Sequence, residues 1–411
     1  MFDQVKKAFS AGYTRQFWVL FVGTIVIRTG SSMIWPFTLS YVGDKIGVAM
    51  TAAAFLLTIR SMTSLVSSFI SGPITDSIGR KTAMIIGILG YVFTYLGMLA
   101  ANSMAGFIVV MLFAGLVEPM FRTGVDAMLV DIIPEEKRID AYSVNRMGQN
   151  VGIALGPMVG GLLISISYNL AMIGATIAML IFLVMIVFGV KETLSTRVAL
   201  SQSMKPRALF DGYQRVFRDG KFMVSTLLIV LAYVGFSQVW TLMQPYTGNV
   251  LGMSEALFAL LPMTNAVMVI VFQLPFTFLA KRFTLIQAMV IGCAVYMTSI
   301  ISFSFAQNFW MVWLGFVVLT CGEMFYVPAS TTFAANLAPD DMRGRYMGFY
   351  SIYWAVASGI GPLIGGLIND NIGARWIWVG AALFPLMASL GYLVMDRREK
   401  QQQSKHQQEF A

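Results

Sequence analysis

The sequence predicts an all-α membrane protein whose twelve transmembrane helices form two parallel six-helix repeats. A glycine-proline hexapeptide at 156–161 returns at 361–366, 205 residues later, which is half of the 411-residue chain. Hydrophobic residues make up 57% of the sequence and charged residues only 12%, a balance that would expose a large apolar surface to water. The chain is therefore expected to be a tandem duplication whose solvent is a lipid bilayer.

The predicted transmembrane helices are apolar stretches of about 20 residues, the length that crosses about 30 Å of hydrocarbon. Six lie in each half, and a polar break at 369–375 separates the last two spans of the second copy. An even number of spans in each half returns the chain to its starting side, so the copies are parallel repeats. The spans are predicted at 17–40, 49–71, 81–100, 105–130, 141–166, 168–190, 222–245, 255–280, 286–306, 309–336, 346–368 and 375–394.

These spans divide the sequence into four parts. Residues 1–190 form the first six-helix bundle and residues 222–396 the second. The polar connection at 191–221 has apolar residues at helical spacing opposite charged ones, which predicts a short amphipathic helix at the cytoplasmic interface. Residues 397–411 are rich in glutamine and charge, and a disordered cytoplasmic tail is expected there.

The distribution of basic residues predicts the orientation in the membrane. Outside the spans, nearly all Lys and Arg fall on one face, and only Lys45 and Arg375 fall on the other. The positive-inside rule places the basic face and both termini in the cytoplasm, as in a multi-pass protein of the bacterial cytoplasmic (inner) membrane. The net charge of +8 then reflects topology and attraction to lipid, so no nucleic-acid partner is predicted.

The sequence offers no residue set for enzymatic or metal chemistry. Cys293 and Cys321 fall inside predicted spans without the spacing of a disulfide or a metal centre, and the single histidine, His406, lies in the tail. No nucleophile, metal-ligand set or nucleotide loop is recognised. We therefore expect no enzyme, no metal and no cofactor, and any intramembrane proton carrier has to be a carboxylate.

The connection between the second and third spans carries the most specific motif. Its characteristic residues are Gly72, Asp76, Gly79, Arg80 and Lys81. Together with twelve spans in two parallel repeats, this motif resembles the major facilitator superfamily of secondary transporters, over essentially the whole chain. The resemblance implies a conformational latch: the aspartate docks against the start of the eleventh span, and the arginine reaches an acid at the end of the fourth span, here Asp131. The alternative is a basic turn that only obeys topology.

Two glycine-proline motifs indicate the subclass. The residues that fit are Gly152, Gly156, Pro157, Gly160 and Gly161, with the copy Gly361, Pro362, Gly365 and Gly366. By resemblance, the pattern on the fifth span marks proton-coupled exporters of the drug-antiporter type. Small residues at this spacing let helices touch backbone to backbone, and proline loosens the helix. Bending seams are expected between spans five and eight and between spans eleven and two, although generic helix packing explains the same pattern.

Seven charged residues are predicted at mid-membrane, where burial is costly and a functional role is the first hypothesis. They are Arg28, Arg60, Glu118, Arg122, Asp126, Arg146 and Glu323. Glu118, Arg122 and Asp126 are spaced by four residues, so they share one helical face. In a structural interpretation, Glu118 pairs with Arg122 or Arg28. Asp126 likewise pairs with Arg60 or Arg122.

In the functional interpretation, Glu118 and Glu323 occupy equivalent repeat positions and face each other across a central cavity, where proton and substrate compete for a carboxylate. Glu323 has no basic residue in the predicted spans of its own half, so it is expected to be protonated, solvated or paired across the interface between the halves. Residues 322–328 resemble span ten of drug-exporting facilitators, where this glutamate serves proton or substrate binding. Two positions depart from the family pattern: Met111 stands where an arginine is usual, and Arg146 stands where some related carriers have an acid.

Aromatic and amide side chains on spans one, five, seven, ten and eleven are candidates for lining the cavity. Aromatic walls suit hydrophobic or amphipathic solutes, and bundle packing is the equal alternative for each residue. The candidates are Trp35, Gln149, Trp240, Gln244, Tyr326, Tyr353 and Trp354.

These features predict a monomeric, proton-coupled exporter of amphipathic or hydrophobic organic compounds that works by alternating access. Its partners would be a small-molecule substrate, protons and the lipid bilayer. Two alternatives remain. A transporter of an anionic solute, such as an organic acid, phosphorylated metabolite or lipid, would use the cavity arginines Arg28, Arg122 and Arg146. A membrane receptor or scaffold would show no solute flux.

Overall fold

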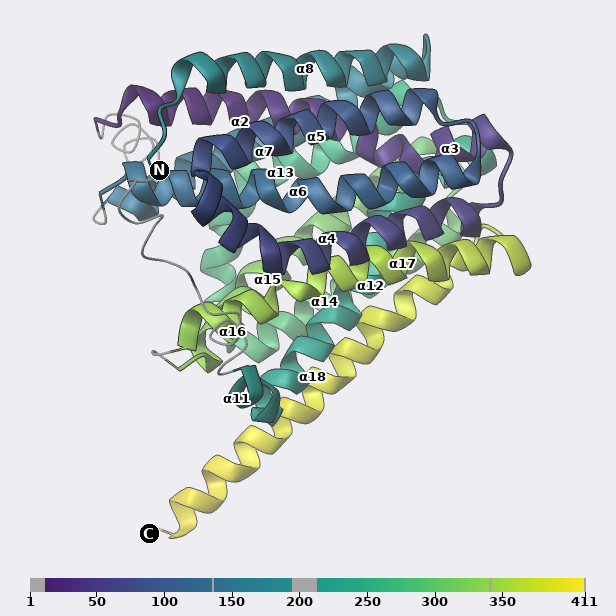
Figure 1. Cartoon of the computed structure of the whole chain (residues 1–411). Helices are drawn as coiled ribbons and strands as arrows, with labels where there is room; N and C mark the ends of the chain where they lie inside the picture. Colours follow the sequence, from purple (N-terminus) through teal and green to yellow (C-terminus); the bar gives the residue numbers. More distant parts are fainter. Residues whose placement is uncertain (1–11, 135–136, 194–212, 340–341, 410–411) are drawn as a thin grey trace. The chain divides into compact units, whose positions relative to one another are not determined.

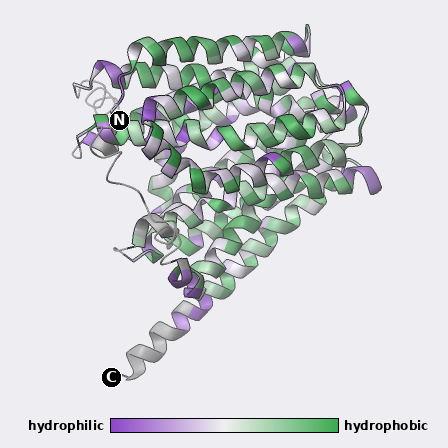
Figure 2. Ribbon diagram, in the orientation of Figure 1, coloured by the Kyte–Doolittle hydropathy of each residue, from purple (hydrophilic) through white to green (hydrophobic). Residues whose placement is uncertain are grey.

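Helices are the regular secondary structure of the residues that the computed structural model describes, 12–134, 137–193, 213–339 and 342–409. Within these ranges, 12 helices are long and apolar enough to cross a membrane. Apolar residues run along these helices in Figure 2, and hydrophilic ones gather near their ends. Each helix lies on one predicted span, so the expected all-α membrane fold is confirmed.

The chain divides into two compact units, and the division does not follow the midpoint of the sequence. The first unit comprises Met1–Val48, Phe55–Leu209 and Met253–Ala266. The second comprises Ala49–Ala54, Phe210–Gly252 and Val267–Ala411. Each unit therefore includes the beginning of one helix whose remainder belongs to the other.

In the first unit, α2 packs against α7 and α8, and α5 packs against α6 and α8. Figure 1 shows α2, α5, α6, α7 and α8 running along one another. Thr14, Ser103 and Ser167 cap α2, α6 and α8 by accepting hydrogen bonds from backbone N–H groups. The helices are α2 (Arg15–Ile34), η1 (Trp35–Phe37), α3 (Thr38–Ile46), α4 (Met50–Ile78), α5 (Arg80–Ala100), α6 (Met104–Ile132), α7 (Arg138–Ile164) and α8 (Tyr168–Gly189).

The second unit repeats these pairings. Here α12 packs against α17 and α18, and α14 packs against α15 and α18. The helices are α11 (Tyr213–Arg218), α12 (Gly220–Leu251), α13 (Glu255–Ala280), α14 (Leu285–Ser302), η3 (Phe303–Phe305), α15 (Phe309–Leu337), α16 (Arg343–Tyr350), α17 (Ile352–Asn371) and α18 (Trp376–Glu409).

Individual contacts confirm the duplication that the sequence predicts. The hydroxyl of Tyr41 donates to the carbonyl of Met98 at 2.9 Å, and 205 residues later Tyr246 donates to Phe303 at 3.0 Å. Gly47 and Gly252 end the helices that contain these tyrosines, and both have φ of 63°. Only glycine adopts this left-handed conformation without steric cost, so the same chain reversal is encoded twice.

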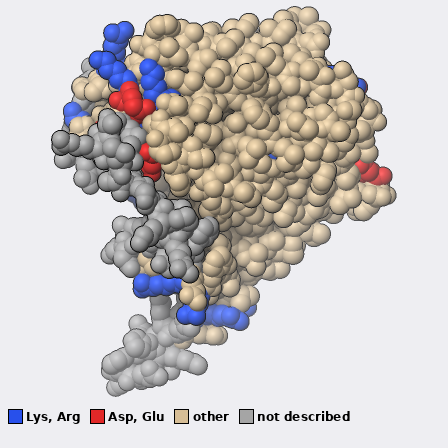
Figure 3. All heavy atoms as spheres, viewed as in Figure 1, with Lys and Arg blue, Asp and Glu red and all other residues tan. Residues whose placement is uncertain are grey.

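The surface of the described residues is apolar over wide areas. Val109, Ile166, Phe188 and Trp310 are each at least 65% exposed. On the face drawn in Figure 3, charged side chains lie near helix ends and leave most of the surface uncharged. A chain that exposes this much apolar area is stable only in lipid, so the protein is an integral, multi-pass membrane protein.

Two segments outside the spans can be compared with the sequence prediction. In the described part of the expected amphipathic helix, α11 buries Val216, exposes Arg215 and Arg218, and places the ring of Phe217 5.3 Å from Phe349. Residues 194–212 lie outside the described ranges. The predicted disordered tail is instead helical as far as Glu409. Extending an existing helix avoids the cost of nucleation, and glutamine and lysine are good helix formers.

Candidate functional site

The latch motif lies at the junction of α4 and α5. The Arg80 guanidinium is 3.1 Å from Asp76 one turn earlier and 3.1 Å from Asp131 at the end of α6. Its side chain is only 12% exposed, which strengthens both charge-assisted contacts. The structure thus brings Arg80 and Asp131 together as the family resemblance implies, and it shows Asp76 paired within its own loop.

Two further residues contact the latch motif, and the sequence did not predict them. Glu192, just beyond α8, accepts 3.0 Å hydrogen bonds from the backbone N–H groups of Arg80 and Lys81, so it caps the amino end of α5. Thr193 donates a hydrogen bond of 2.7 Å to Asp131. A side chain on Gly79, at φ 96°, would collide with the Glu192 carboxylate at 2.4 Å.

A sequence signal for Glu192 existed. A helix that starts with Arg80 and Lys81 directly after a glycine has exposed N–H groups and basic side chains but no capping side chain of its own. An acidic residue where the chain next returns to the same side of the bundle is the natural acceptor for these N–H groups. The latch therefore includes the first residues of the connection between the two halves of the sequence.

The main intramembrane ion pair joins α4 to α6. The Arg60 guanidinium contacts Glu118 at 2.8 Å, and the side chains are 27% and 31% exposed. The prediction that Glu118 pairs with Arg122 or Arg28 is wrong. Its partner is set by Gly115, one turn before Glu118, where a Cβ would come within 2.5 Å of the Arg60 carbonyl oxygen. The absent side chain lets α4 cross α6 at that level.

The other predicted charges of the first unit surround this pair. Arg28 on α2 and Arg122 on α6 both lie within electrostatic reach of Glu118 and of Asp126. Arg28 is half-buried, whereas Arg122 and Asp126 are exposed. Arg146 lies in α7, and its side chain is outside the described ones. Three described arginines, Arg28, Arg60 and Arg122, thus lie near two acids, Glu118 and Asp126. This group of five residues carries an excess positive charge.

The glycines of the first motif mainly bring α7 against α2. A Cβ at Gly152 would lie 2.5 Å from the Cβ of Arg28, and one at Gly156 2.4 Å from the Cβ of Ser32. Gly160 meets the backbone of Met33 in the same way. The expected contact with span eight rests on Gly161 alone, whose Cβ would lie 2.7 Å from the carbonyl oxygen of Glu255.

The copied motif on α17 repeats this arrangement. Gly361 and Gly365 face Ser237 and Leu242 of α12, and a Cβ on either glycine would come within 2.2 Å of these side chains. Gly366 instead meets Thr51 at the start of α4, with a Cβ distance of 2.8 Å. At each predicted seam, the last glycine of the motif lies close to the backbone of the other helix, while the other glycines pack on spans one and seven.

The predicted carboxylate of the second unit, Glu323, lies half-buried on α15 and within electrostatic reach of Tyr296 on α14. Tyr296 belongs to an aromatic cluster of the second unit. The ring of Tyr296 is 5.6 Å from that of Tyr326, and the ring of Tyr233 is 4.3 Å from Tyr353 and 5.8 Å from Tyr326. Helices α12, α14, α15 and α17 all contribute to the aromatic cluster, which is defined here as Tyr233, Phe236, Tyr296, Tyr326 and Tyr353.

Tyr326 occupies a different place from the cavity wall that the sequence predicts. It is fully buried, and its hydroxyl lies 3.0 Å from that of Tyr392. The reason is Gly292, which has no side chain and therefore lets α14 pack closely against α15. A Cβ added at this position would lie 2.7 Å from the Cβ of Tyr326. Tyr233, Phe236 and Tyr296 were missed, because aromatic residues within long apolar stretches resemble ordinary core residues.

The remaining candidates for cavity lining differ in exposure. Gln244 is buried at 4% exposure, and Trp354 is exposed. The half-buried members are Trp35, Gln149, Trp240 and Tyr353. Trp35 begins the short 3-10 helix η1, where Pro36 interrupts the first span. Within the described residues, no group of three or more Cys, His, Asp or Glu could hold a metal ion.

These features define a transporter built from duplicated six-helix halves. The family model described as Major Facilitator Superfamily matches residues 20–361 and again 226–411, and the chain belongs to this family. It is therefore a membrane transporter of small molecules and not an enzyme. The alternative of a receptor or scaffold is set aside, because the relatives that the chain matches are transporters.

Several relatives align over nearly the whole chain. An uncharacterized MFS-type transporter of Bacillus subtilis, YttB, is 28% identical and covers 93% of this chain and 95% of its own length. A Na(+), Li(+), K(+)/H(+) antiporter of Planococcus maritimus is 23% identical over 93% and 96%. The quinolone resistance protein NorA of Staphylococcus aureus is 21% identical over 87% and 90%. A POT family transporter solved with 5-aminolevulinic acid shares the fold, with TM-score 0.77, 17% identity and coverage of 94% and 97%.

Proposed function

We propose that this protein is a proton-coupled exporter of amphipathic or hydrophobic organic compounds. The observation that carries the proposal is Glu323, a half-buried carboxylate on a membrane-spanning helix beside the aromatic cluster. A carboxyl group in low-dielectric surroundings is neutral when protonated and strongly attracts a cation when it is ionised. The same group can therefore bind a proton and a cationic substrate in turn. Tyr353, the half-buried tyrosine of the cluster, offers a ring that suits an apolar body with a positive charge.

The relatives support this assignment. Among the proteins aligned over most of the chain, one is named for quinolone resistance and another for cation exchange against protons. The glycine seams at Gly161 and Gly366 supply backbone contacts at which helices can slide or separate. Arg80 and Asp131 supply a polar latch that can open during alternating access.

The remaining parts of the proposal concern Glu118 and topology. Glu118 is the second candidate for proton binding, and it becomes available only when its ion pair with Arg60 opens. We place both termini in the cytoplasm of a bacterium, with the protein in the cytoplasmic membrane. A monomer suffices, because each unit supplies its own carboxylate.

The test uses purified protein in liposomes with an imposed pH gradient. A lipophilic cation, a neutral drug and an organic anion are offered in turn, and proton movement is followed with a pH-sensitive dye. Cationic and neutral compounds should each drive proton movement, and Glu323→Gln should abolish it. Glu255→Gln, an acid in the first turn of α13, is the matched control and should keep most of the activity. Unchanged coupling in Glu323→Gln would refute the proposal.

A second candidate function is carriage of an anionic solute. The observation in its favour is the excess positive charge of the group around Glu118, to which Arg28 and Arg122 contribute. In this case Arg122→Gln should abolish transport of an organic anion, while Glu323→Gln leaves it intact. Coupling to anions alone would replace the main proposal.

A further inference from the structure

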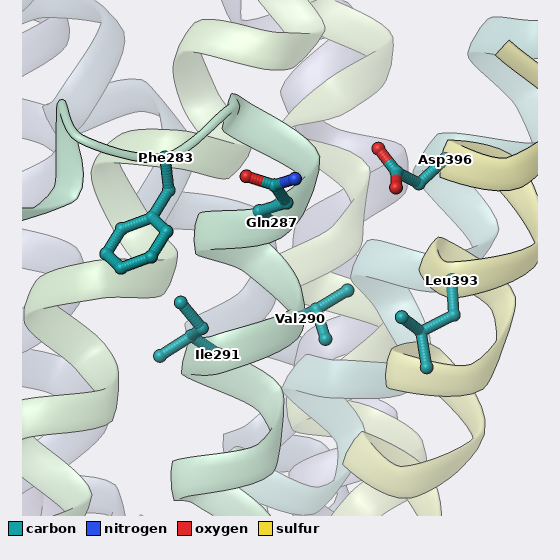
Figure 4. Close-up of a pocket in the computed structure, with 6 residues that line it drawn as sticks. All are labelled: Phe283, Gln287, Val290, Ile291, Leu393 and Asp396. Atoms are coloured by element: carbon teal, nitrogen blue, oxygen red, sulfur yellow. The ribbon is translucent and has the colours of Figure 1, made fainter. Parts of the chain in front are cut away.

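A hollow of about 350 Å³ opens between α14 and α18 in the second unit. Its wall is largely apolar, and Figure 4 shows Gln287 and Asp396 facing each other across one end of it. Gln287 belongs to the first turn of α14, and Asp396 lies near the end of the last span. The lining residues are Phe283, Gln287, Val290, Ile291, Leu393 and Asp396.

In the first unit, the chain itself lies at the equivalent place. There α8 ends at Gly189, and the following residues turn onto the amino end of α5, where Glu192 caps the helix. Lys81 also reaches across and donates to the carbonyl of Val187 at 2.8 Å. The two copies therefore differ in what packs on the amino end of α5 and of its counterpart α14.

In the second unit the corresponding helix, α18, continues straight to Glu409 instead of turning. The amino end of α14 is capped locally: the Thr284 hydroxyl accepts from Gln287 N at 3.2 Å, and Gln287 Oε1 accepts from Thr284 N at 3.1 Å. The hollow lies beside this end of α14, where α18 runs on instead of turning onto it.

The polar end of the hollow offers one donor and one acceptor. Because Gln287 Oε1 is used by the capping box, its amide N–H groups are directed toward the side of Asp396, as Figure 4 shows. The Asp396 side chain is 17% exposed and pairs with the more exposed Lys400 at 2.5 Å. Exposed Lys281 and Arg282 lie in the turn just before α14.

These groups match a phospholipid with a primary ammonium headgroup. Half-exposed Phe283 and Leu393 and the side chains of Val290 and Ile291 form an apolar surface at the edge of the bilayer, which suits acyl chains. Amide N–H groups donate to phosphate oxygens, and a carboxylate accepts from an ammonium. A quaternary ammonium has no N–H to donate to Asp396, and an anionic headgroup brings no cation for this carboxylate.

We propose that this hollow is a binding site for one phosphatidylethanolamine molecule from the leaflet next to the turn between α13 and α14. The acyl chains lie along Val290, Ile291 and Leu393. The ammonium group bonds to Asp396, and the phosphate bonds to Gln287. The site is independent of the transported substrate, and the proposal does not rest on the proposed function.

The experiment is native mass spectrometry of the full-length protein titrated with dioleoyl phosphatidylethanolamine, phosphatidylcholine or phosphatidylglycerol. We expect the first ethanolamine lipid to bind about tenfold more tightly than the choline lipid, the difference that one charge-assisted hydrogen bond gives. Asp396→Asn should remove this preference. Lys400→Gln, which breaks the same ion pair but keeps the carboxylate, should retain it.

A second pair of variants tests the hollow itself. Val290→Trp should fill it and weaken all first-lipid binding, whereas Ile85→Trp, at the equivalent repeat position on α5, should not. Equal or tighter binding of phosphatidylglycerol, or an ethanolamine preference that survives Asp396→Asn, would overturn the proposal. Lipid binding unchanged by Val290→Trp, or weakened equally by Ile85→Trp, would also overturn it.

Discussion

Asp370 at the end of α17 accepts a hydrogen bond of 2.8 Å from the backbone N–H of Thr51 in the first turn of α4. Its other oxygen accepts from the side chain of Asn369 at 2.9 Å. One turn earlier, Gly366 allows the backbone of α4 to approach α17. Asp370 therefore acts as an N-terminal cap supplied by a different helix, and it ties two helix ends together within the second unit.

Replacing Asp370 by alanine should destabilise the protein by about 1 kcal/mol, the usual cost of a lost helix cap. The cap is exposed, so asparagine, which keeps an acceptor oxygen, should recover about half of the loss. Thermal unfolding in detergent measures both effects. Asn371→Ala is the control, because Asn371 donates only to the carbonyl of Leu367 in its own helix. A Tm of Asp370→Ala equal to that of the control would contradict this role.

The two seam glycines should tolerate no side chain if the seams must close during transport. A methyl group at Gly161 or Gly366 would lie within about 2.8 Å of backbone atoms of α13 or α4, a distance at which the helices have to separate. Gly161→Ala and Gly366→Ala should each reduce transport at least about tenfold while expression and folding remain. Initial rates in liposomes measure this.

The control for the seam variants is Gly248→Ala on α12, where the new Cβ would meet only Gln244 Nε2 at 3.9 Å, an ordinary contact. It should transport normally. If Gly366→Ala also transports normally, the α17 seam does not have to close. Loss of transport in the control would show that glycine is needed for helix bending and not for contact.

Much of the fold could be predicted, because it depends on patterns that are local in sequence. The length of the apolar stretches located the helices, and the returned glycine-proline hexapeptide showed the duplication. The tyrosine contacts at Tyr41 and Tyr246 repeat because the same local sequence meets the same neighbouring helix. Arg80 and Asp131 were paired by family resemblance and lie 3.1 Å apart.

The remaining site contacts depend on helix crossings that spacing alone does not reveal. The partner of Glu118 is decided by where α4 crosses α6 at Gly115, not by its distance in sequence from Arg122. Glu192 acts on α5 only because the chain turns after α8. In the second copy α18 continues as a helix, and no pattern in the spans indicated that difference.

The Arg80–Asp131 contact should be measurable as a coupling energy. A double-mutant cycle of Arg80→Gln and Asp131→Asn should give about 1 kcal/mol, since the arginine is 12% exposed and keeps one fixed geometry. The more exposed pair Lys400 and Asp396, spaced by four on α18, should give about 0.3–0.5 kcal/mol. Chemical or thermal unfolding of the four variants of each cycle supplies the values, and equal couplings would show that Arg80 is no latch.

Breaking the Arg60–Glu118 pair from one side should cost more than removing both charges. Glu118→Gln leaves the Arg60 guanidinium, whose side chain is 27% exposed, without its closest counter-charge inside a membrane span, and a loss of a few kcal/mol is expected. The double variant Arg60→Met with Glu118→Met removes both charges and should recover at least half of that loss. Asp126→Asn, at an exposed acid on the same helix, is the control and should change stability by less than about 1 kcal/mol. Unfolding in detergent at several salt concentrations measures these differences. A double variant as unstable as Glu118→Gln would show that packing of the two long side chains, and not their charge, holds α4 against α6.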